Sequence, residues 1–162
     1  MEIQVGQKIP DVTLVQMGPE GPVEVPIADK LAGRKVVIFG LPGAFTPTCS
    51  AAHLPSFIRT KAAFDEKGVD EIICISVNDA HVMKVWGETS GATEAGITML
   101  ADVASEFTKA IGMEFSNPIV GFFDRCRRFS AYVEDGVVKV MNIEVARGAC
   151  ELSAGETLLE QI

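Results

Sequence analysis

Three short apolar runs, rich in β-branched residues, constrain the fold of this chain more than any other feature. They lie at 36–41, 71–77 and 97–100, and segments with helical spacing separate them. Strands that are joined through helices need crossover connections, and these connections place helices on both faces of a sheet. The pattern therefore predicts an α/β protein whose sheet is covered by helices on both sides.

The segments between these runs carry the usual signals for helix ends. Residues 54–67 are amphipathic, and Gly68 follows them as a suitable C-terminal cap. Asn78 and Asp79 precede the next helical segment, and either side chain suits the first position of a helix. A third helix is expected at 103–111.

The pattern changes in the last quarter of the chain. Two alternating apolar runs, 129–133 and 137–143, flank the turn residues at 134–136, which include an Asp-Gly pair. This arrangement predicts a β-hairpin. A helix is expected from about Ser153 to the end, because Ser153 and Glu156 have the spacing of a capping box.

Length and charge limit the possible partners. The chain has 162 residues, 48% of them hydrophobic, which is enough to bury one core, and we expect one domain over residues 1–162. The net charge of −8 argues against nucleic acid and anionic membranes as partners, because both are negatively charged themselves. No apolar stretch approaches the ~20 residues that cross a bilayer, and the N-terminus lacks the pattern of a secretory signal.

The cysteines indicate the redox environment. Cys49, Cys74, Cys126 and Cys150 are scattered along the chain without a CxxC pair. This spacing fits neither a disulfide-dense secreted scaffold nor a zinc ribbon. We therefore expect a soluble, cytoplasmic protein whose thiols stay reduced and can act as reagents.

Cys49 lies at the point where the first apolar strand gives way to a helix. Thr46 is a suitable N-cap, and Pro47 suits the first helical position because its missing N–H would have no partner there. Cys49 is then expected in the first turn, among unpaired backbone N–H groups. These groups and the helix dipole favour the thiolate over the thiol.

Magnitudes show that a helix end alone is too weak to activate a cysteine. Lowering the pKa of an ordinary thiol from ~8.5 to ~6 takes roughly 3.4 kcal/mol. A helix terminus supplies about 0.3 to 2 kcal/mol. A cationic partner is therefore expected, and the run Arg125-Cys126-Arg127-Arg128 is the candidate, because an arginine is permanently charged and can hold two oxygens at once.

His53 offers a different interpretation of the same cysteine. It lies four residues after Cys49, on the same helical face, so a Cys–His pair of the hydrolase type is conceivable. No Asn or Asp obviously orients this histidine. A structural or pocket-lining role for His53 is therefore favoured.

The segment PGAFTPTCS (42–50) resembles the active-site motif of the peroxiredoxins, Pro-x-x-x-Thr-x-x-Cys, with Pro42, Thr46 and Cys49 at its fixed positions. The segments ICISVNDAHVMKVW and RRFSAYVEDGVVKVMNIE resemble the type II branch, which includes atypical two-cysteine members. The similarity covers nearly the whole chain in the same order. It implies a thioredoxin-like α/β fold, with a central mixed β-sheet flanked by helices, and a homodimer.

The resemblance also assigns roles to residues. Cys49 corresponds to the peroxidatic cysteine, which reduces hydrogen peroxide and alkyl hydroperoxides. The Thr46 hydroxyl would contact peroxide and thiolate, and Pro42 would shield the site from water. Arg128 corresponds to the family's arginine, and Arg127 is the neighbouring alternative, because strand alternation lets only one of the two face the pocket.

The chemistry of such a site uses groups of the protein alone. Attack of the Cys49 thiolate on the O–O bond gives a sulfenic acid and releases water or an alcohol. Arginine and backbone N–H groups would stabilise the charge that spreads over the oxygens. No metal or organic cofactor is required.

The sulfenic acid must then be reduced, and two routes remain open. Cys150 resembles the resolving cysteine of atypical two-cysteine members, and the alternative is an external thiol from glutaredoxin, glutathione or thioredoxin. Cys74 is expected to be a buried strand residue. Cys126 is expected to be a surface thiol without a role.

Two rival functions use the same cysteine. A thiol-disulfide oxidoreductase or a hydrolase would direct Cys49 at a disulfide or an acyl group, but the missing CxxC and the missing orienting partner count against them. A redox sensor would pass its oxidation to a partner protein, and turnover with a small thiol would distinguish the two.

Overall fold

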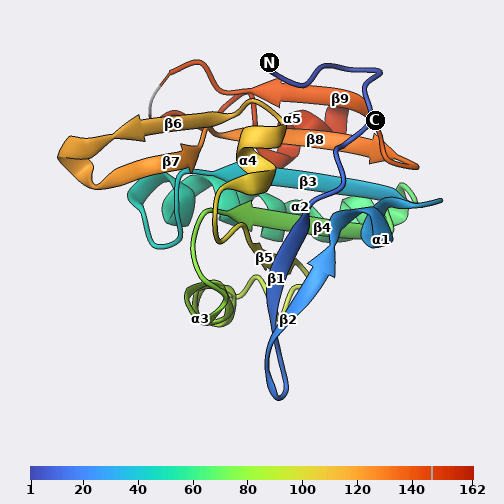
Figure 1. Ribbon diagram of the computed structural model, residues 1–162. Helices are drawn as coiled ribbons and strands as arrows, with labels where there is room; N and C mark the ends of the chain where they lie inside the picture. Colours follow the sequence, from blue (N-terminus) through green and yellow to red (C-terminus); the bar gives the residue numbers. More distant parts are fainter. Residues whose placement is uncertain (147) are drawn as a thin grey trace.

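The computed structural model describes residues 1–146 and 148–162. Its main sheet has seven strands in the order β2-β1-β5-β4-β3-β8-β9 (Figure 1). The strand bounds are β1 Thr13–Gly18, β2 Gly21–Pro26, β3 Lys35–Leu41, β4 Glu71–Ser76, β5 Thr98–Ala101, β8 Phe129–Glu134 and β9 Val137–Ile143.

The centre of this sheet is mixed, as predicted. β3 pairs in parallel with β4, and β4 with β5, whereas β8 runs antiparallel to β3 and forms the predicted hairpin with β9. The three apolar runs therefore correspond to the three parallel strands, with ends shifted by about one residue. Crossover helices join these strands, because a parallel pair cannot be closed by a tight turn.

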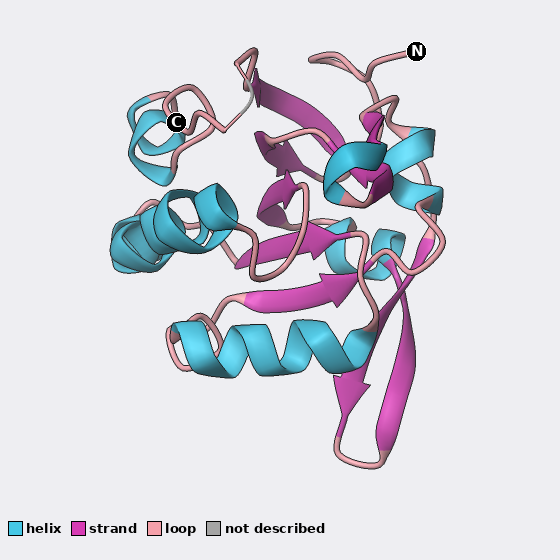
Figure 2. Ribbon diagram, turned by 90° about the vertical axis from the view of Figure 1, so that its left-hand side faces the viewer, coloured by secondary structure: helices cyan, strands magenta, loops and turns pink. Residues whose placement is uncertain are grey.

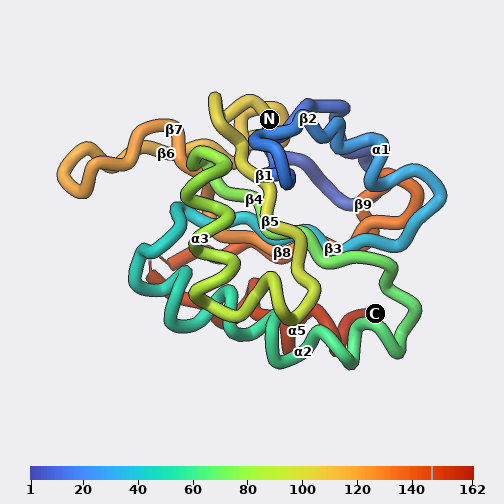
Figure 3. The backbone as a smooth tube through the Cα atoms, turned by 90° about the horizontal axis from the view of Figure 1, so that it is seen from below, coloured from blue at the N-terminus to red at the C-terminus, as the bar shows by residue number. Residues whose placement is uncertain are grey.

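Helices cover both faces of the sheet (Figure 2). The long helices α2 (Leu54–Glu66) and α3 (Ala80–Ser90) and the C-terminal α5 (Gly155–Glu160) pack on one face. The short helices α1 (Ile27–Leu31) and α4 (Glu106–Ala110) pack on the other (Figure 3).

The alternation along β3 shows how the strands join these two layers. Val37, Phe39 and Leu41 belong to the core beneath α2 and α3, while Val36 and Ile38 belong to the core beneath α1 and α4. Successive side chains of a strand point to opposite faces. A continuous apolar run is therefore the expected sequence of a strand that is buried on both sides.

One predicted helix start is wrong, and a carboxylate interaction gives the reason. The third helix begins at Glu106 rather than 103, because Asp102 accepts hydrogen bonds from the backbone N–H groups of Phe107 and Thr108, and Ser105 is left-handed (φ 60°). By contrast, Asp79 caps α3 as predicted and accepts from the backbone N–H of Val82 at 2.8 Å.

The C-terminal helix begins at Gly155 and has no capping box. The Ser153 hydroxyl donates to the carboxylate of Glu144, and Glu156 pairs with Arg59. Both residues of the expected box therefore bind partners that are distant in the sequence.

A second, two-stranded sheet, β6 (Glu114–Asn117) and β7 (Phe122–Cys126), projects past the ends of the main-sheet strands (Figure 1). The 3-10 turn Pro118–Val120 connects its strands. β7 leads directly to Arg127 and Arg128, and thus fixes the direction in which β8 enters the main sheet. Within the described residues, the helices are too short or too polar to traverse a lipid bilayer.

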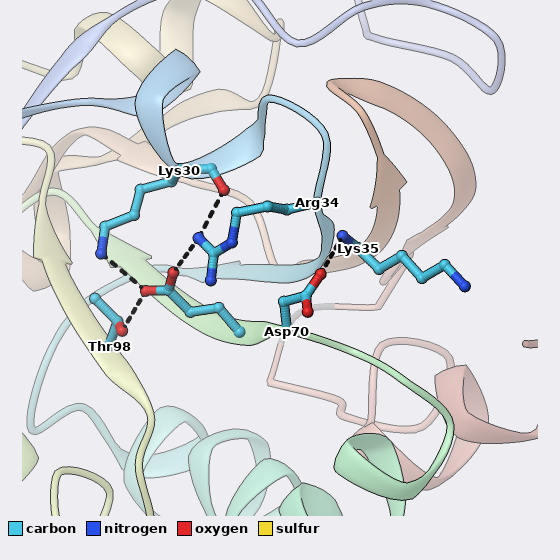
Figure 4. Close-up of polar contacts among 6 residues, drawn as sticks. Lys30, Arg34, Lys35, Asp70 and Thr98 are labelled. Atoms are coloured by element: carbon cyan, nitrogen blue, oxygen red, sulfur yellow. Dashed lines mark hydrogen bonds and ion pairs between the residues drawn. The ribbon is translucent and has the colours of Figure 1, made fainter.

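An ionic cluster braces the amino ends of the parallel strands (Figure 4). The Glu71 carboxylate at the start of β4 accepts from Lys30 Nζ at 3.1 Å, from Arg34 Nη1 at 2.7 Å and from the Thr98 hydroxyl. Burial would raise the pKa of Glu71, but the hydrogen bonds from Thr98, Arg34 and Lys30 outweigh it and hold that pKa below its ordinary value.

Candidate active site

Cys49 follows the carboxyl end of β3 by one short loop. The helix begins at Pro47, as the sequence predicts, and Cys49 opens a π-helical turn, η1 (Cys49–His53). In this turn the backbone N–H of Leu54 donates to the carbonyl of Cys49, five residues back. Pro55 lacks an N–H and so removes one donor from the α-helical pattern at this point, which accommodates the wider turn.

Thr46 does not cap the helix with its side chain. Its hydroxyl donates to the carbonyl of Gly43 at 2.7 Å. The hydroxyl proton is therefore already engaged, and the oxygen lone pairs remain to accept a hydrogen bond. Phe45, in the same loop, is left-handed (φ 64°) and has an exposed side chain.

Arg128 is the cation beside Cys49. It immediately precedes β8, whose first residue Phe129 is the register partner of Gly40 near the end of β3. Arg128 Nη2 donates to Cys49 Sγ at 3.4 Å, and Arg128 Nη1 lies 3.1 Å from His53 Nδ1. Cys49 is 0% exposed and Arg128 only 7%, so this contact is shielded from water.

His53 is neutral and serves as a partner for Arg128. Burial, the larger cause, and the Arg128 charge together lower the pKa of His53 to about 3, and the hydrogen bond with the carbonyl of Ser153 acts in the opposite direction. The neutral ring donates from Nε2 to that carbonyl at 3.1 Å and accepts from Arg128 at Nδ1. The geometry does not support the hydrolase-type Cys–His pair, because Cys49 Sγ contacts Arg128 and both ring nitrogens of His53 bind other partners.

Arg127, the alternative to Arg128, turns away from the thiol. Its guanidinium donates to the Glu2 carboxylate and to the carbonyl of Gly112. Both arginines nevertheless line the cavity described below, so the expectation that only one of them would face it is wrong. What separates them is their partners, since Arg128 reaches the thiol whereas Arg127 binds Glu2 and Gly112.

Arg125 contributes a contact that the sequence did not reveal. Arg125 Nη1 donates to the carbonyl of Pro42 at 2.9 Å, and its guanidinium lies over the ring of Phe122. A Cβ at Gly43 would stand 2.5 Å from the same Nη1, so the glycine leaves room for this approach. The arginine run at 125–128 was the signal in the sequence that pointed to this segment.

A cavity of about 760 Å³ brings most of the candidate residues together. Pro42, Thr46 and Arg128 line it, and Arg128 connects it to the buried Cys49. Much of the remaining wall is apolar and comes from the small sheet and from the end of β9, namely Phe115, Val120, Phe122 and Ile143.

Cys150 lies in the loop between β9 and α5 and is half-buried. Burial raises its pKa, and the positive charge of Arg128 offsets part of this rise. The loop touches the helix that carries Cys49, since the Thr48 hydroxyl donates to the carbonyl of Gly148 at 2.9 Å. Cys150 is thus within the electrostatic reach of the site, as a free thiol.

The remaining two cysteines are buried in the core. Cys74 is a strand residue in β4, as predicted, and burial raises its pKa. Cys126 is not the predicted surface thiol. It is fully buried, because it belongs to the core beneath α1 and α4, and burial raises its pKa to about 12.

Among residues 1–146 and 148–162, no group of three His, Cys, Asp or Glu side chains is arranged to hold a metal ion. The chemistry that the site offers is that of a buried thiol beside an arginine, and this arginine lines a partly apolar cavity.

Known proteins share this architecture and sequence. The Redoxin family model matches residues 4–159. Peroxiredoxin-2E-2, chloroplastic, of Oryza sativa subsp. japonica is 45% identical, over 99% of this chain and 72% of its own length. Peroxiredoxin-2B of Arabidopsis thaliana is 39% identical, over 99% and 98%. The structure of reduced Prx3 in complex with H2O2 from Vibrio vulnificus superposes with a TM-score of 0.92 at 45% identity, over 98% of each chain.

These similarities extend well beyond the motif around Cys49. They confirm the thioredoxin-like α/β fold, with its mixed central sheet between layers of helices. A family match over residues 4–159, together with a buried thiol beside an arginine, leads to one conclusion: the chain belongs to the peroxiredoxins, in their type II branch, and is a thiol-dependent peroxidase.

Proposed function

We propose that Cys49 is the peroxidatic cysteine and that it reduces hydrogen peroxide and alkyl hydroperoxides. The observation that carries this assignment is the 3.4 Å contact between Arg128 Nη2 and Cys49 Sγ, at a cavity that Pro42 and Thr46 also line. The contact places a permanently charged guanidinium against the sulfur that would attack the peroxide.

The reaction balances without a cofactor. The thiolate sulfur forms a bond to one peroxide oxygen, the O–O bond breaks, and the departing oxygen takes a proton and leaves as water or an alcohol. Arg128 stabilises the charge that develops on the oxygens, which grows towards the transition state. The Thr46 oxygen, whose proton is engaged by Gly43, accepts a hydrogen bond from the peroxide O–H.

Pro42 closes the site against water in this proposal. Its ring lines the cavity, and its carbonyl is held by Arg125. The apolar part of the wall, from Phe115 to Ile143, suits hydroperoxides with a hydrocarbon group. Hydrogen peroxide and alkyl hydroperoxides are therefore both proposed as substrates.

Cys150 is the proposed resolving residue. Its half-buried thiol lies in a loop that already touches the Cys49 helix through Thr48 and Gly148. A disulfide needs the two Cα atoms within about 7 Å, so the loop and the first helical turn would have to adjust. The alternative route uses an external thiol, and in both cases glutaredoxin, glutathione or thioredoxin is the proposed electron source.

The setting of the enzyme is also a proposal. Residues 1–162 act as one domain, and the protein works in the cytoplasm as a homodimer, with neither nucleic acid nor membrane as partner. Exposed Phe45 and Phe123 near the site suit an interface. The names of several relatives place those proteins in chloroplasts or mitochondria, so a compartment assay with the full-length chain decides this point.

The test treats the fully reduced protein with one equivalent of hydrogen peroxide, traps free thiols and maps all four cysteines by mass spectrometry. Rapid loss of the Cys49 thiol together with a 49–150 disulfide supports both roles. Sulfenic acid at Cys49 alone assigns recycling to an outside thiol. The reference rate is that of the Cys150 thiol in a Cys49→Ser variant. If the Cys49 thiol of the parent protein reacts with peroxide no faster than this reference, the assignment is overturned.

A further inference from the structure

Glu144, just beyond the end of β9, organises the turn that precedes α5. Its carboxylate accepts hydrogen bonds from three consecutive backbone N–H groups, those of Glu151 (3.2 Å), Leu152 (3.3 Å) and Ser153 (3.0 Å). It also accepts from the Ser153 hydroxyl at 2.8 Å. One carboxylate thus fixes the main chain of the whole turn.

This turn is connected to Cys49 through a buried chain of hydrogen bonds. The carbonyl of Ser153 accepts from His53 Nε2 at 3.1 Å, His53 Nδ1 accepts from Arg128 Nη1 at 3.1 Å, and Arg128 Nη2 reaches Cys49 Sγ at 3.4 Å. His53 and Ser153 are fully buried, so water cannot easily replace a lost partner. The backbone N–H of Glu144 also donates to the carbonyl of Arg128 at 2.9 Å.

The tautomer of His53 makes this connection specific. A neutral imidazole has one donor nitrogen and one acceptor nitrogen, and Arg128 can only donate. The Ser153 carbonyl holds the proton on Nε2, and Nδ1 is then free to accept from Arg128. If the turn moved, the proton could lie on Nδ1, where it would face the guanidinium and displace it from the thiol.

We propose that Glu144 is a positioning residue for the Cys49 centre, holding Arg128 on the thiol through Ser153 and His53. This inference rests on the proposed roles of Cys49 and Arg128. A simple charge effect would change the rate in the opposite direction. Removing the negative charge of Glu144 would by itself favour the Cys49 thiolate, whereas loss of the positioning of Arg128 slows the reaction with peroxide.

The test compares two reagents in a Cys150→Ser background, so that only Cys49 chemistry is observed. Rate constants are measured by stopped flow with hydrogen peroxide, which needs Arg128 in place, and with iodoacetamide, which needs only an accessible thiolate. Trp86, the one tryptophan of the chain, can report the reaction, since its Nε1 donates to the Ser50 hydroxyl next to Cys49.

Two variants separate geometry from charge. Glu144→Gln keeps the shape and removes the charge, and Glu144→Asp keeps the charge but withdraws the carboxylate from the turn. We expect both to slow the peroxide reaction by about 10- to 100-fold. The iodoacetamide rate should change by no more than about fivefold. Glu151→Gln is the matched control, because it removes a charge from the same turn and keeps the backbone N–H, and it should leave both rates unchanged.

A double-mutant cycle with Arg128→Ala tests the path of the effect. If Glu144 acts through Arg128, Glu144→Gln should change the peroxide rate by less than about twofold in that background. A folded Glu144→Gln protein that reacts with peroxide at the parent rate would overturn the inference alone, and so would an undiminished effect in the Arg128→Ala background. If Cys49 of the parent reacts no faster than an ordinary thiol, the proposed function fails, and the inference fails with it.

Discussion

Positively charged side chains have different partners at the two ends of the parallel strands. At the amino ends, Lys30 and Arg34 share the carboxylate of Glu71. At the carboxyl ends, Arg128 is almost fully buried, yet its side-chain partners are a neutral imidazole and a thiol. Among the described residues, no ion pair involves Arg128.

This difference separates stability from function within one sheet. A compensated cluster braces the strands, whereas a buried cation without a carboxylate costs stability and is usually retained for another reason. At the carboxyl end the missing negative charge can be supplied by the reaction itself, as the thiolate and then as the breaking peroxide. The following predictions test this contrast, from the largest expected effect to the smallest.

Replacing Arg128 should slow the reaction of Cys49 with peroxide and change the stability of the protein little. Arg128→Met removes the cation and keeps much of the volume, and the peroxide rate constant of Cys49 should fall by about 10² to 10³. The free energy of unfolding, measured in urea, should fall by no more than about 1 kcal/mol, because a buried uncompensated charge is also removed. Arg59→Met, at an exposed ion pair, is the control for the rate. A large loss of stability with an unchanged rate would reverse the contrast.

As the pH falls, the free energy of unfolding should decrease first through protonation of His53 on unfolding, and only at lower pH through protonation of Glu71. The pKa of His53 is about 3 in the folded protein and about 6.5 when unfolded, so the unfolded state binds more protons in between. Stability is therefore complete above pH 6.5 and declines as the pH falls towards 3, by about 2 kcal/mol at pH 5 from this residue. Urea unfolding at pH 7.5 and 5 measures the decline, and His53→Asn should flatten it.

Replacing Glu71 should produce the opposite result to replacing Arg128. Glu71→Gln leaves Lys30 and Arg34 without their shared carboxylate, and we expect a loss of about 1 kcal/mol in the free energy of unfolding. The peroxide rate should stay within about twofold of the parent, because distant sites act independently. Glu156→Gln, at the exposed pair with Arg59, should cost less and serves as the comparison. A slowed peroxide reaction in Glu71→Gln would show that the two ends are coupled.

The smallest effect is expected from Cys150. Cys150→Ser should leave the first reaction of Cys49 with peroxide unchanged within about twofold, since Cys150 would act only after the sulfenic acid has formed. Mass spectrometry should then find the sulfenic acid of Cys49 in place of a disulfide. A slower first step would mean that Cys150 supports the geometry around Arg128.

The sequence predicted what depends on local pattern. The apolar runs identified β3, β4 and β5, and Asp-Gly identified the β8–β9 turn, because these signals depend on residues that are adjacent along the chain. The position of Cys49 behind Pro47 also followed from local rules. The choice of Arg128 over Arg127 came from the resemblance, and the 3.4 Å contact with Cys49 agrees with it.

The remaining features depend on contacts that no local pattern reveals. Ser153 and Glu156 have the spacing of a capping box, but Glu144 and Arg59 bind them first. Cys126 between two arginines suggested a surface thiol, because the small sheet of β6 and β7 that buries it was not predicted. The neutral state of His53 required knowledge of Arg128 and Ser153, which lie far from it in the sequence.

The π-helical turn at Cys49 also has a consequence for insertions and deletions. This turn contains one residue more than an α-helical turn, so the direction of the Cys49 side chain depends on a count of residues as well as on their identity. Losing one residue between Cys49 and α2 would restore ordinary helical spacing and rotate the sulfur by about 100° away from Arg128. The number of residues in this one helical turn thus determines whether the thiol and the arginine are in contact.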